Sequence, residues 1–196
     1  NKKLKGREVF RTIMFLPMIV APAAVAMVWK WLYNSNFGLI NNVFGIKVNW
    51  ISNPDIAIYS IAVIGIWSVI GYNMVLFLAG LQEVPRDYYE AAALDGASGV
   101  QQFFRITVPL ISPTIFFVLV TRIIAAMQVF DLIYMIIDYN NPALKKTESL
   151  VYLFYKYSFE QSKKGYGATV IVVLLAVIMV LTVFQLIGQK KWVHYD

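Results

Sequence analysis

The sequence predicts an all-α membrane protein, a polytopic bundle with four transmembrane helices. Hydrophobic residues make up 59% of the 196 positions and charged residues 14%, whereas soluble domains average roughly 45–50% and 25%. Four apolar runs are long enough to cross a hydrocarbon core, which takes about 20 helical residues. They cover about residues 10–33, 56–81, 108–137 and 168–188. No linker or low-complexity segment divides the chain, so we expect a single domain over residues 1–196.

The first and fourth runs differ in what they predict about their surroundings. Pro17 and Pro22 lie inside the first run, and a proline removes a backbone donor and kinks a helix. A membrane tolerates such a kink where neighbouring helices or water satisfy the freed carbonyl groups, so we expect this run inside the bundle. The fourth run is nearly free of polar residues and is the best candidate for a lipid-facing helix.

Basic residues near the ends of the runs predict the orientation of the chain. The segments KKLKGREVFR and QKKW lie at the two ends, and four spans would place both on one side, which the positive-inside rule makes cytoplasmic. The connection 82–107 would share that side, while segments 34–55 and 138–167 would lie outside. The second outer segment runs against this bias, since it carries the lysines Lys145, Lys146, Lys156, Lys163 and Lys164.

The connection between the second and third runs contains the stretch EAAALDGASGVQQFFRITVP. Pro85 suits the start of a helix, because its missing N–H group is not needed there. The sequence predicts a helix over residues 86–94, a reversal at Gly96 and a second short helix over 97–105 that leads to Pro109.

The first of these short helices is expected to dock against another protein. Tyr89, Ala92 and Ala93 share one face, and small alanines allow a partner to approach closely. Glu90 and Asp95 offer carboxylates to Arg or Lys of that partner. The alternative is an amphipathic helix in the lipid headgroup layer, but such helices usually carry bulky apolar residues and a basic polar face.

This module resembles the EAA loop of ABC-importer permeases, whose pattern is EAA, two variable residues, DGA, and a later Ile and Pro. The matching residues are Glu90, Ala91, Ala92, Asp95, Gly96, Ala97, Ile106 and Pro109. The flanks GLQEVPRDYYE and ITVPLISPTI match as well. MFLPMIVAPAAVAMVWKWLYNSNFGLIN and MQVFDLIYMI are similar to the carbohydrate-uptake branch, which includes permeases for maltose, other oligosaccharides and glycerol 3-phosphate.

The resemblance implies a multi-pass permease domain in the cytoplasmic (inner) membrane of a bacterium. Permeases of this branch have at least six spans, so two further spans would precede residue 1. The implied partners are a second permease in a heterodimer, two ATPase subunits and an extracytoplasmic solute-binding protein. The loop of about residues 83–107 would form a coupling helix in a cleft of the ATPase. Glu90 would pair with a basic residue there, Ala91 and Ala92 would allow close packing, and Gly96 would make the turn.

Two sets of residues are candidates for the substrate path. Thr121, Ala125 and Gln128 lie at i, i+4 and i+7 of the third run and so share a helical face. In the second run Trp67, Gly71 and Met74 form a similar stripe, and these six positions match the sugar-contacting helices of the maltose-type permease. A sugar needs hydrogen-bonding side chains and an aromatic surface. Alternatively, Gln and Thr here only join helices to one another.

Arg122 is a charge inside the third run, and such a charge needs a partner or a water-filled cavity. An acidic residue of the second permease would serve, and so would an anionic substrate such as a uronate or a phosphorylated polyol. The outer segment 147–167 is too short to span the membrane. Its aromatic residues Tyr152, Tyr155 and Phe159 predict a helix at the membrane interface or beneath the solute-binding protein.

We expect no enzymatic activity in this chain. It has no GxxxxGK[ST] phosphate-binding loop, no metal-ligand cluster and a single histidine, His194, in the polar tail. ATP and Mg²⁺ would therefore bind to the partner ATPase, and the chain would contact membrane lipid but no nucleic acid. The alternatives are a permease for peptides or polyamines, a stand-alone channel and a membrane-embedded enzyme.

Overall fold

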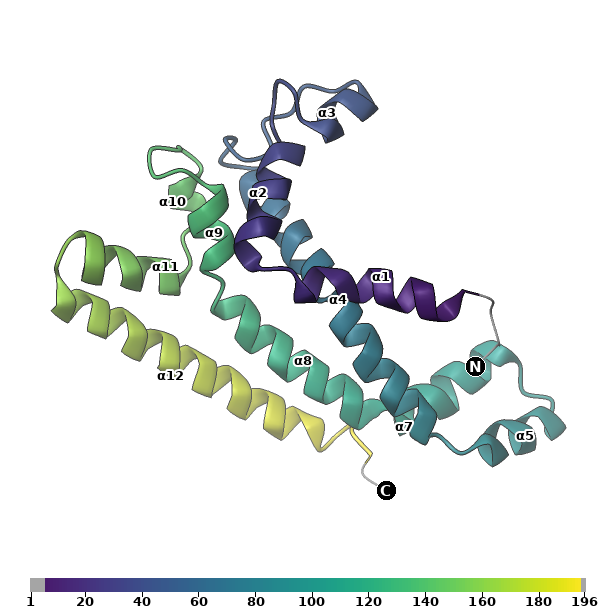
Figure 1. Ribbon diagram of the computed structural model, residues 1–196. Coiled ribbons are helices and arrows are strands. Elements are labelled where there is room, and N and C mark those ends of the chain that lie inside the picture. Colours follow the sequence, from purple (N-terminus) through teal and green to yellow (C-terminus); the bar gives the residue numbers. More distant parts are fainter. Residues whose placement is uncertain (1–5, 195–196) are drawn as a thin grey trace. The chain divides into compact units, whose positions relative to one another are not determined.

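A computed structural model describes residues 6–194, and every regular element in that range is a helix. The predicted all-α class is confirmed. Figure 1 shows the helices in chain order. They are α1 (Arg7–Ile19), α2 (Pro22–Leu32), α3 (Leu39–Phe44), α4 (Ala57–Glu83), α5 (Arg86–Leu94), α6 (Gly99–Gln102), the π-helix η1 (Phe103–Thr107), α7 (Val108–Leu110), α8 (Ser112–Met127), α9 (Asp131–Ile136), α10 (Leu144–Thr147), α11 (Leu150–Tyr155), the π-helix η2 (Lys156–Glu160) and α12 (Lys164–Gln189).

Two of the four predicted spans are single long helices. The helix α4 has 27 residues and α12 has 26, and both are long and apolar enough to cross a membrane. The other two runs qualify only as bent pairs: α1 with α2, bent by 100°, and the helical segment 99–110 with α8, bent by 66°. The described residues therefore contain two candidate spans, or four when each bent pair is counted as one.

The bend between α1 and α2 follows from local sequence. Val20 and Ala21 have extended backbones with ψ of 138° and 133°, and Pro22 opens α2. Proline fits the first turn of a helix but not the interior of a continuing one. The kink predicted here is therefore present at Pro22, where it separates two helices, whereas Pro17 lies inside α1.

The third predicted span, residues 108–137, is wrong as a single helix. It breaks at Ile111, between α7 and α8, and again after Met127, where residues 128–130 are not helical. The chain then resumes as α9, which packs against α2. Gln128 consequently lies beyond the end of α8, so it does not continue the helical face of Thr121 and Ala125.

The chain forms two compact units, residues 6–71 with 127–174 and residues 72–126 with 175–194 of the described range. The first unit has an apolar core contributed by α2, α4, α9, α10 and α11. Its buried members are Val25, Ala26, Tyr33, Ala57, Ile61, Ile64, Ile133, Ile136, Ile137, Ala143, Leu144 and Tyr152. Two ion pairs join helices of this unit to its connecting segments: Lys30 of α2 pairs with Asp138 at 2.6 Å, and Lys146 of α10 pairs with Asp55 at 2.5 Å.

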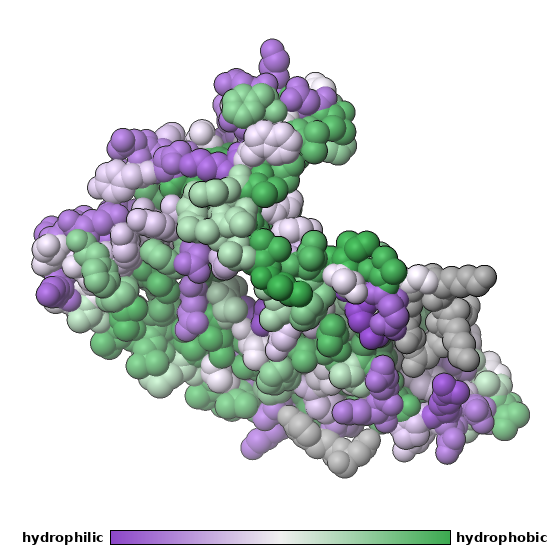
Figure 2. Space-filling model, in the orientation of Figure 1, coloured by the Kyte–Doolittle hydropathy of each residue, from purple (hydrophilic) through white to green (hydrophobic). Residues whose placement is uncertain are grey.

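The second unit contains the end of α4, the helices α5 to α8 and the end of α12. Gly80 of α4 lies so close to Thr114 of α8 that a Cβ atom would overlap its side chain. The backbone N–H of His194 donates to the buried hydroxyl of Ser112 at 2.9 Å. The apolar window of α12 is only 6% buried, against 17% for α4, and its visible face is largely hydrophobic (Figure 2). Its predicted contact with lipid fits this exposure and stays a prediction.

Candidate functional site

The short helix α5 has the bounds that the sequence predicts, Arg86–Leu94. Pro85 is its N-cap with an extended backbone, so the proline stands one residue before the helix. None of the residues of α5 is buried. Glu90 and Ala91 are exposed. Of the three residues predicted to share an apolar face, Tyr89 and Ala92 are half-buried and Ala93 is exposed.

Gly96 ends this helix with φ of +77°, the left-handed conformation that glycine adopts without strain. The N–H of Ala97 donates to the carbonyl oxygen of Ala92 at 2.9 Å, and that of Gly96 donates to Ala93 at 3.1 Å. These two bonds form a Schellman motif, which satisfies carbonyl groups at the helix end. The predicted reversal at Gly96 is confirmed, and the exposed Asp95 is the residue that caps the helix.

The returning arm is a capped helix that widens into a π-helix. Ser98 and Gln101 form a reciprocal capping box at the start of α6, which supplies two of the donors at a helix N-terminus with partners. The π-helix η1 then leads into α7. We call residues 85–107 the α5–η1 module. A second short helix was predicted over 97–105, and the structure has it from Gly99 to Thr107 in two parts.

A side-chain hydrogen bond joins the two arms of this module. The hydroxyl groups of Tyr89 and Thr107 lie 2.8 Å apart, and Thr107 is only 7% exposed. The sequence predicted Tyr89 on an apolar face of α5 and did not predict its hydrogen bond with Thr107. The sequence does show a hydroxyl group on each of these residues. However, spacing alone does not predict a contact between residues that are 18 positions apart.

The outer surface of the α5–η1 module mixes charge with large apolar side chains. Glu90 makes no ion pair within the described range, and Leu94 beside it is 90% exposed. Val100 and Phe104 are 68% and 65% exposed. Figure 2 shows hydrophilic and hydrophobic side chains mixed around α5. Exposed apolar groups flanked by charge are typical of a protein interaction site.

The six candidate path residues divide equally between the two units. Trp67 packs its ring edge-on against Trp29 at 5.5 Å, and Gly71 is buried against α1. Thr121 donates back to carbonyl groups of its own helix, Phe117 and Val118. The others are Met74, half-buried on α4, Ala125, exposed on α8, and Gln128, exposed beyond it.

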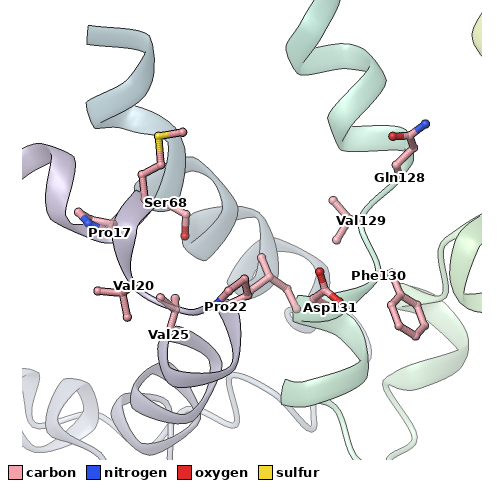
Figure 3. Close-up of a pocket in the computed structure, with 11 residues that line it drawn as sticks. Pro17, Val20, Pro22, Val25, Ser68, Gln128, Val129, Phe130 and Asp131 are labelled. Carbon is pink, nitrogen blue, oxygen red and sulfur yellow. The ribbon is translucent and has the colours of Figure 1, made fainter. Parts of the chain in front are cut away.

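One cavity of about 340 Å³ lies in the first unit, next to two of the helix breaks (Figure 3). Pro17, Val20 and Pro22 line it from the break between α1 and α2, and residues 128–132 line it from the break between α8 and α9. Of the six path candidates only Gln128 lines it. The sequence did not predict this cavity, although Gln128 and Asp131 mark its polar part, because residues 108–137 were expected to form one helix.

Arg122 lies on α8 with its guanidinium carbon 5.3 Å from the centre of the Tyr72 ring. Its buried Nε atom has no hydrogen-bond partner within the described part of the chain. The aromatic face supplies electrostatic attraction to the charge, a contact that the sequence did not predict.

The outer segment 147–167 contains two short helical elements, α11 and η2. Tyr152 is 2% exposed, and this burial raises the pKa of its hydroxyl to about 12. Lys156 lies 2.5 Å from the carboxylate of Glu148, and that hydrogen bond raises the pKa of the lysine. Tyr155 and Phe159 stack at 5.6 Å. The three aromatic residues therefore divide between the core and the surface.

Comparisons with known proteins agree with these features. The family model for the binding-protein-dependent transport system inner membrane component matches residues 1–193. The chain is 36% identical to the sn-glycerol-3-phosphate transport system permease protein UgpA of Yersinia enterocolitica, covering 98% of this chain and 66% of that one. It is 34% identical to the trehalose/maltose transport system permease protein MalF of Thermococcus litoralis, covering 95% and 63%.

The fold is also that of a solved structure. A chain of a bacterial ABC transporter involved in the import of the acidic polysaccharide alginate superposes with a TM-score of 0.87 at 22% identity, covering 97% of this chain and 68% of that one. The chain thus spans about two thirds of the length of the proteins it matches. On the match over residues 1–193, this chain belongs to the family of binding-protein-dependent transport system inner membrane components.

Proposed function

We propose that this chain is a membrane-spanning subunit of an ATP-driven importer for a sugar or a related polyol, and that its α5–η1 module docks on an ATPase subunit. One observation carries the proposal: α5 has no buried residue, and Glu90 on it has no ion-pair partner in the described range. A short, exposed helix that ends in a Schellman motif and is followed by a capped helix is suited to a cleft of another protein.

The proposed division of labour leaves ATP and Mg²⁺ with two separate ATPase subunits. This chain would bind no cofactor and would supply half of the path through the membrane, with a second permease supplying the other half. An extracytoplasmic solute-binding protein would deliver the solute. Support comes from the family, whose description names dependence on a binding protein.

The proposed location is the bacterial inner membrane, with residues near both described ends on the cytoplasmic side. When each bent pair is counted as one span, two candidate spans precede α5, which supports a position of α5 on that same side. There it would face a cytoplasmic ATPase. The basic residues Lys190 and Lys191 fit this orientation.

The proposed solute class follows from relatives named for sn-glycerol 3-phosphate and for trehalose and maltose. The cavity at the helix breaks is the part of the described chain that fits a role in the path. Gln128 offers an amide and Asp131 a carboxylate, and such groups bind sugar hydroxyls. Trp67, Gly71, Met74, Thr121 and Ala125 would act by shaping the path and its helix contacts.

Co-purification tests the proposed docking. The full-length permease is expressed with its partner permease and a tagged ATPase, and Glu90→Lys is compared with Glu160→Lys, the same charge reversal on the exposed end of η2. We expect Glu90→Lys to reduce recovery of the permease with the ATPase, because the new lysine faces a basic residue, and Glu160→Lys to leave recovery unchanged. Equal recovery of both variants with intact transport would reject the docking role.

The genes beside this one separate the solute classes. A second permease with an EAA loop and a sugar-type binding protein would support sugar import, and a peptide- or polyamine-type binding protein would contradict it. A stand-alone channel would move the solute, and a membrane enzyme would convert its substrate, without any ATPase. Solute uptake by the purified chain alone in vesicles would therefore overturn the proposed importer function.

A further inference from the structure

We propose that the hydrogen bond between Tyr89 and Thr107 makes the α5–η1 module move as one body, so that a displacement of α5 is passed on to α8. This inference rests on the proposed docking of α5 on an ATPase. It assigns Tyr89 and Thr107 as positioning residues, which act through the helices they join and touch neither nucleotide nor solute.

The hydrogen bond between Tyr89 and Thr107 is short and lies inside the protein. Their hydroxyl oxygens are 2.8 Å apart, and either hydroxyl can donate. Thr107 Oγ1 also lies 3.5 Å from the carbonyl oxygen of Gln102, so Thr107 can donate there while it accepts from Tyr89. Thr107 is buried, and a hydrogen bond shielded from water is electrostatically stronger than an exposed one.

The hydrogen bond between Tyr89 and Thr107 joins α5 to the end of η1, at the end of the module opposite the turn. At the other end, the Schellman motif at Gly96 and the capping box at Ser98 already fix the turn. The side chain of Gln102 donates to the carbonyl oxygen of Ala97 at 3.2 Å and braces the returning arm. Without the bond between Tyr89 and Thr107, α5 would be attached mainly through its turn, because none of its residues is buried.

Thr107 is also the last residue of the module, and the chain continues from it through α7 into α8. The N–H of Ile111 donates to the carbonyl oxygen of Thr107 at 3.0 Å, and the N–H of Ile115 donates to Ile111 at 3.0 Å. These backbone bonds continue through the bend at Ile111 into α8. A displacement of α5 therefore has a hydrogen-bonded route to α8 through Tyr89 and Thr107. The π-helix η1, which ends at Thr107, is the kind of irregular helix that occurs at functional sites.

The test follows a nitroxide label on α8 in the assembled transporter. The chain has no cysteine, so Leu119→Cys, at a position 41% exposed on α8, gives it one label site once cysteines of the partner subunits have been replaced. The complex is placed in lipid vesicles, and the change in label mobility on adding ATP and Mg²⁺ is recorded. Co-purification with the ATPase is measured for every variant.

We expect Tyr89→Phe and Thr107→Val to reduce the ATP-dependent change about fivefold, the factor that corresponds to the net contribution of one hydrogen bond, about 1 kcal/mol. The double variant should lose no more than either single one. Thr107→Ser keeps the hydroxyl and should restore the change. Tyr88→Phe is the matched control, because Tyr88 is exposed on the same helix.

The outcomes separate this proposal from the docking proposal. A full ATP response in Tyr89→Phe and Thr107→Val, with the complex intact, would overturn the role of the hydrogen bond and leave docking in place. Failure of Thr107→Ser to restore the response would also overturn it. A parent complex that binds no ATPase, or shows no ATP response, would overturn the proposed function and this inference with it.

Discussion

Gly71 of α4 lies directly against the main chain of α1, so that a Cβ atom at this position would overlap the carbonyl group of Met14. The contact is between two backbones, and neither can move aside as a side chain could. Small residues at membrane helix contacts allow such close approach. In the first unit, Gly71 therefore holds α1 on α4 just before the bend that borders the cavity.

Gly71→Ala is expected to destabilise the protein by about 1–3 kcal/mol, the usual cost of overpacking. The matched control is Gly65→Ala on the same helix, where a new Cβ would lie 4.0 Å from Leu132 Cδ1, an ordinary contact. Thermal unfolding in detergent should show a lower midpoint for the first variant and an unchanged or higher one for the second. Equal midpoints would contradict the close packing of α1 on α4.

Gly96→Ala should loosen the turn of the α5–η1 module, because a left-handed backbone costs an L-residue about 1–2 kcal/mol. No atom lies within 4 Å of the new Cβ, so the effect would come from backbone strain alone. Hydrogen exchange at residues 86–97 should become faster. Gly99→Ala, with equally open space and no positive φ, should leave exchange unchanged, and an equal effect of both variants would refute the strain argument.

The ring of Tyr72 should stabilise the folded protein through its contact with the charge of Arg122. Tyr72→Phe keeps the aromatic face and should retain stability, whereas Tyr72→Leu should lose about 0.5–2 kcal/mol, the range for a cation–π contact. The midpoint of chemical unfolding in detergent measures both. Loss of stability in Tyr72→Phe, or none in Tyr72→Leu, would show that the ring face is not what stabilises Arg122.

The outer segment should lose stability at alkaline pH. Burial raises the pKa of Tyr152 to about 12 in the folded chain, from the usual value of 10.0, so its contribution is complete below pH 10 and is lost as the pH rises toward 12. The raised pKa of Lys156 acts in the same direction, above its usual value of 10.5. Unfolding midpoints between pH 9 and 12 should fall less steeply in Tyr152→Phe, and an equally steep fall would contradict the assignment.

Local sequence predicted the features that local chemistry controls. The bounds of α5 follow from Pro85 before it and Gly96 after it, and the bend near Pro22 follows from the missing N–H group of proline. The break after Met127 has no such signal, because no proline or glycine lies between α8 and α9. That break accompanies the packing of α9 on α2, a tertiary contact. The cavity and the pair of Tyr89 with Thr107 were missed for the same reason.

Cross-linking tests the proposed docking of α5 most directly. Ala91→Cys, exposed on α5, would be the single cysteine of the chain, and a photoactivatable cross-linker attached there is activated in the assembled transporter. We expect a covalent adduct with the ATPase subunit, and none from the control Ser162→Cys, at an exposed position beyond η2. An adduct with lipid or with the second permease only, and none with the ATPase, would contradict the account.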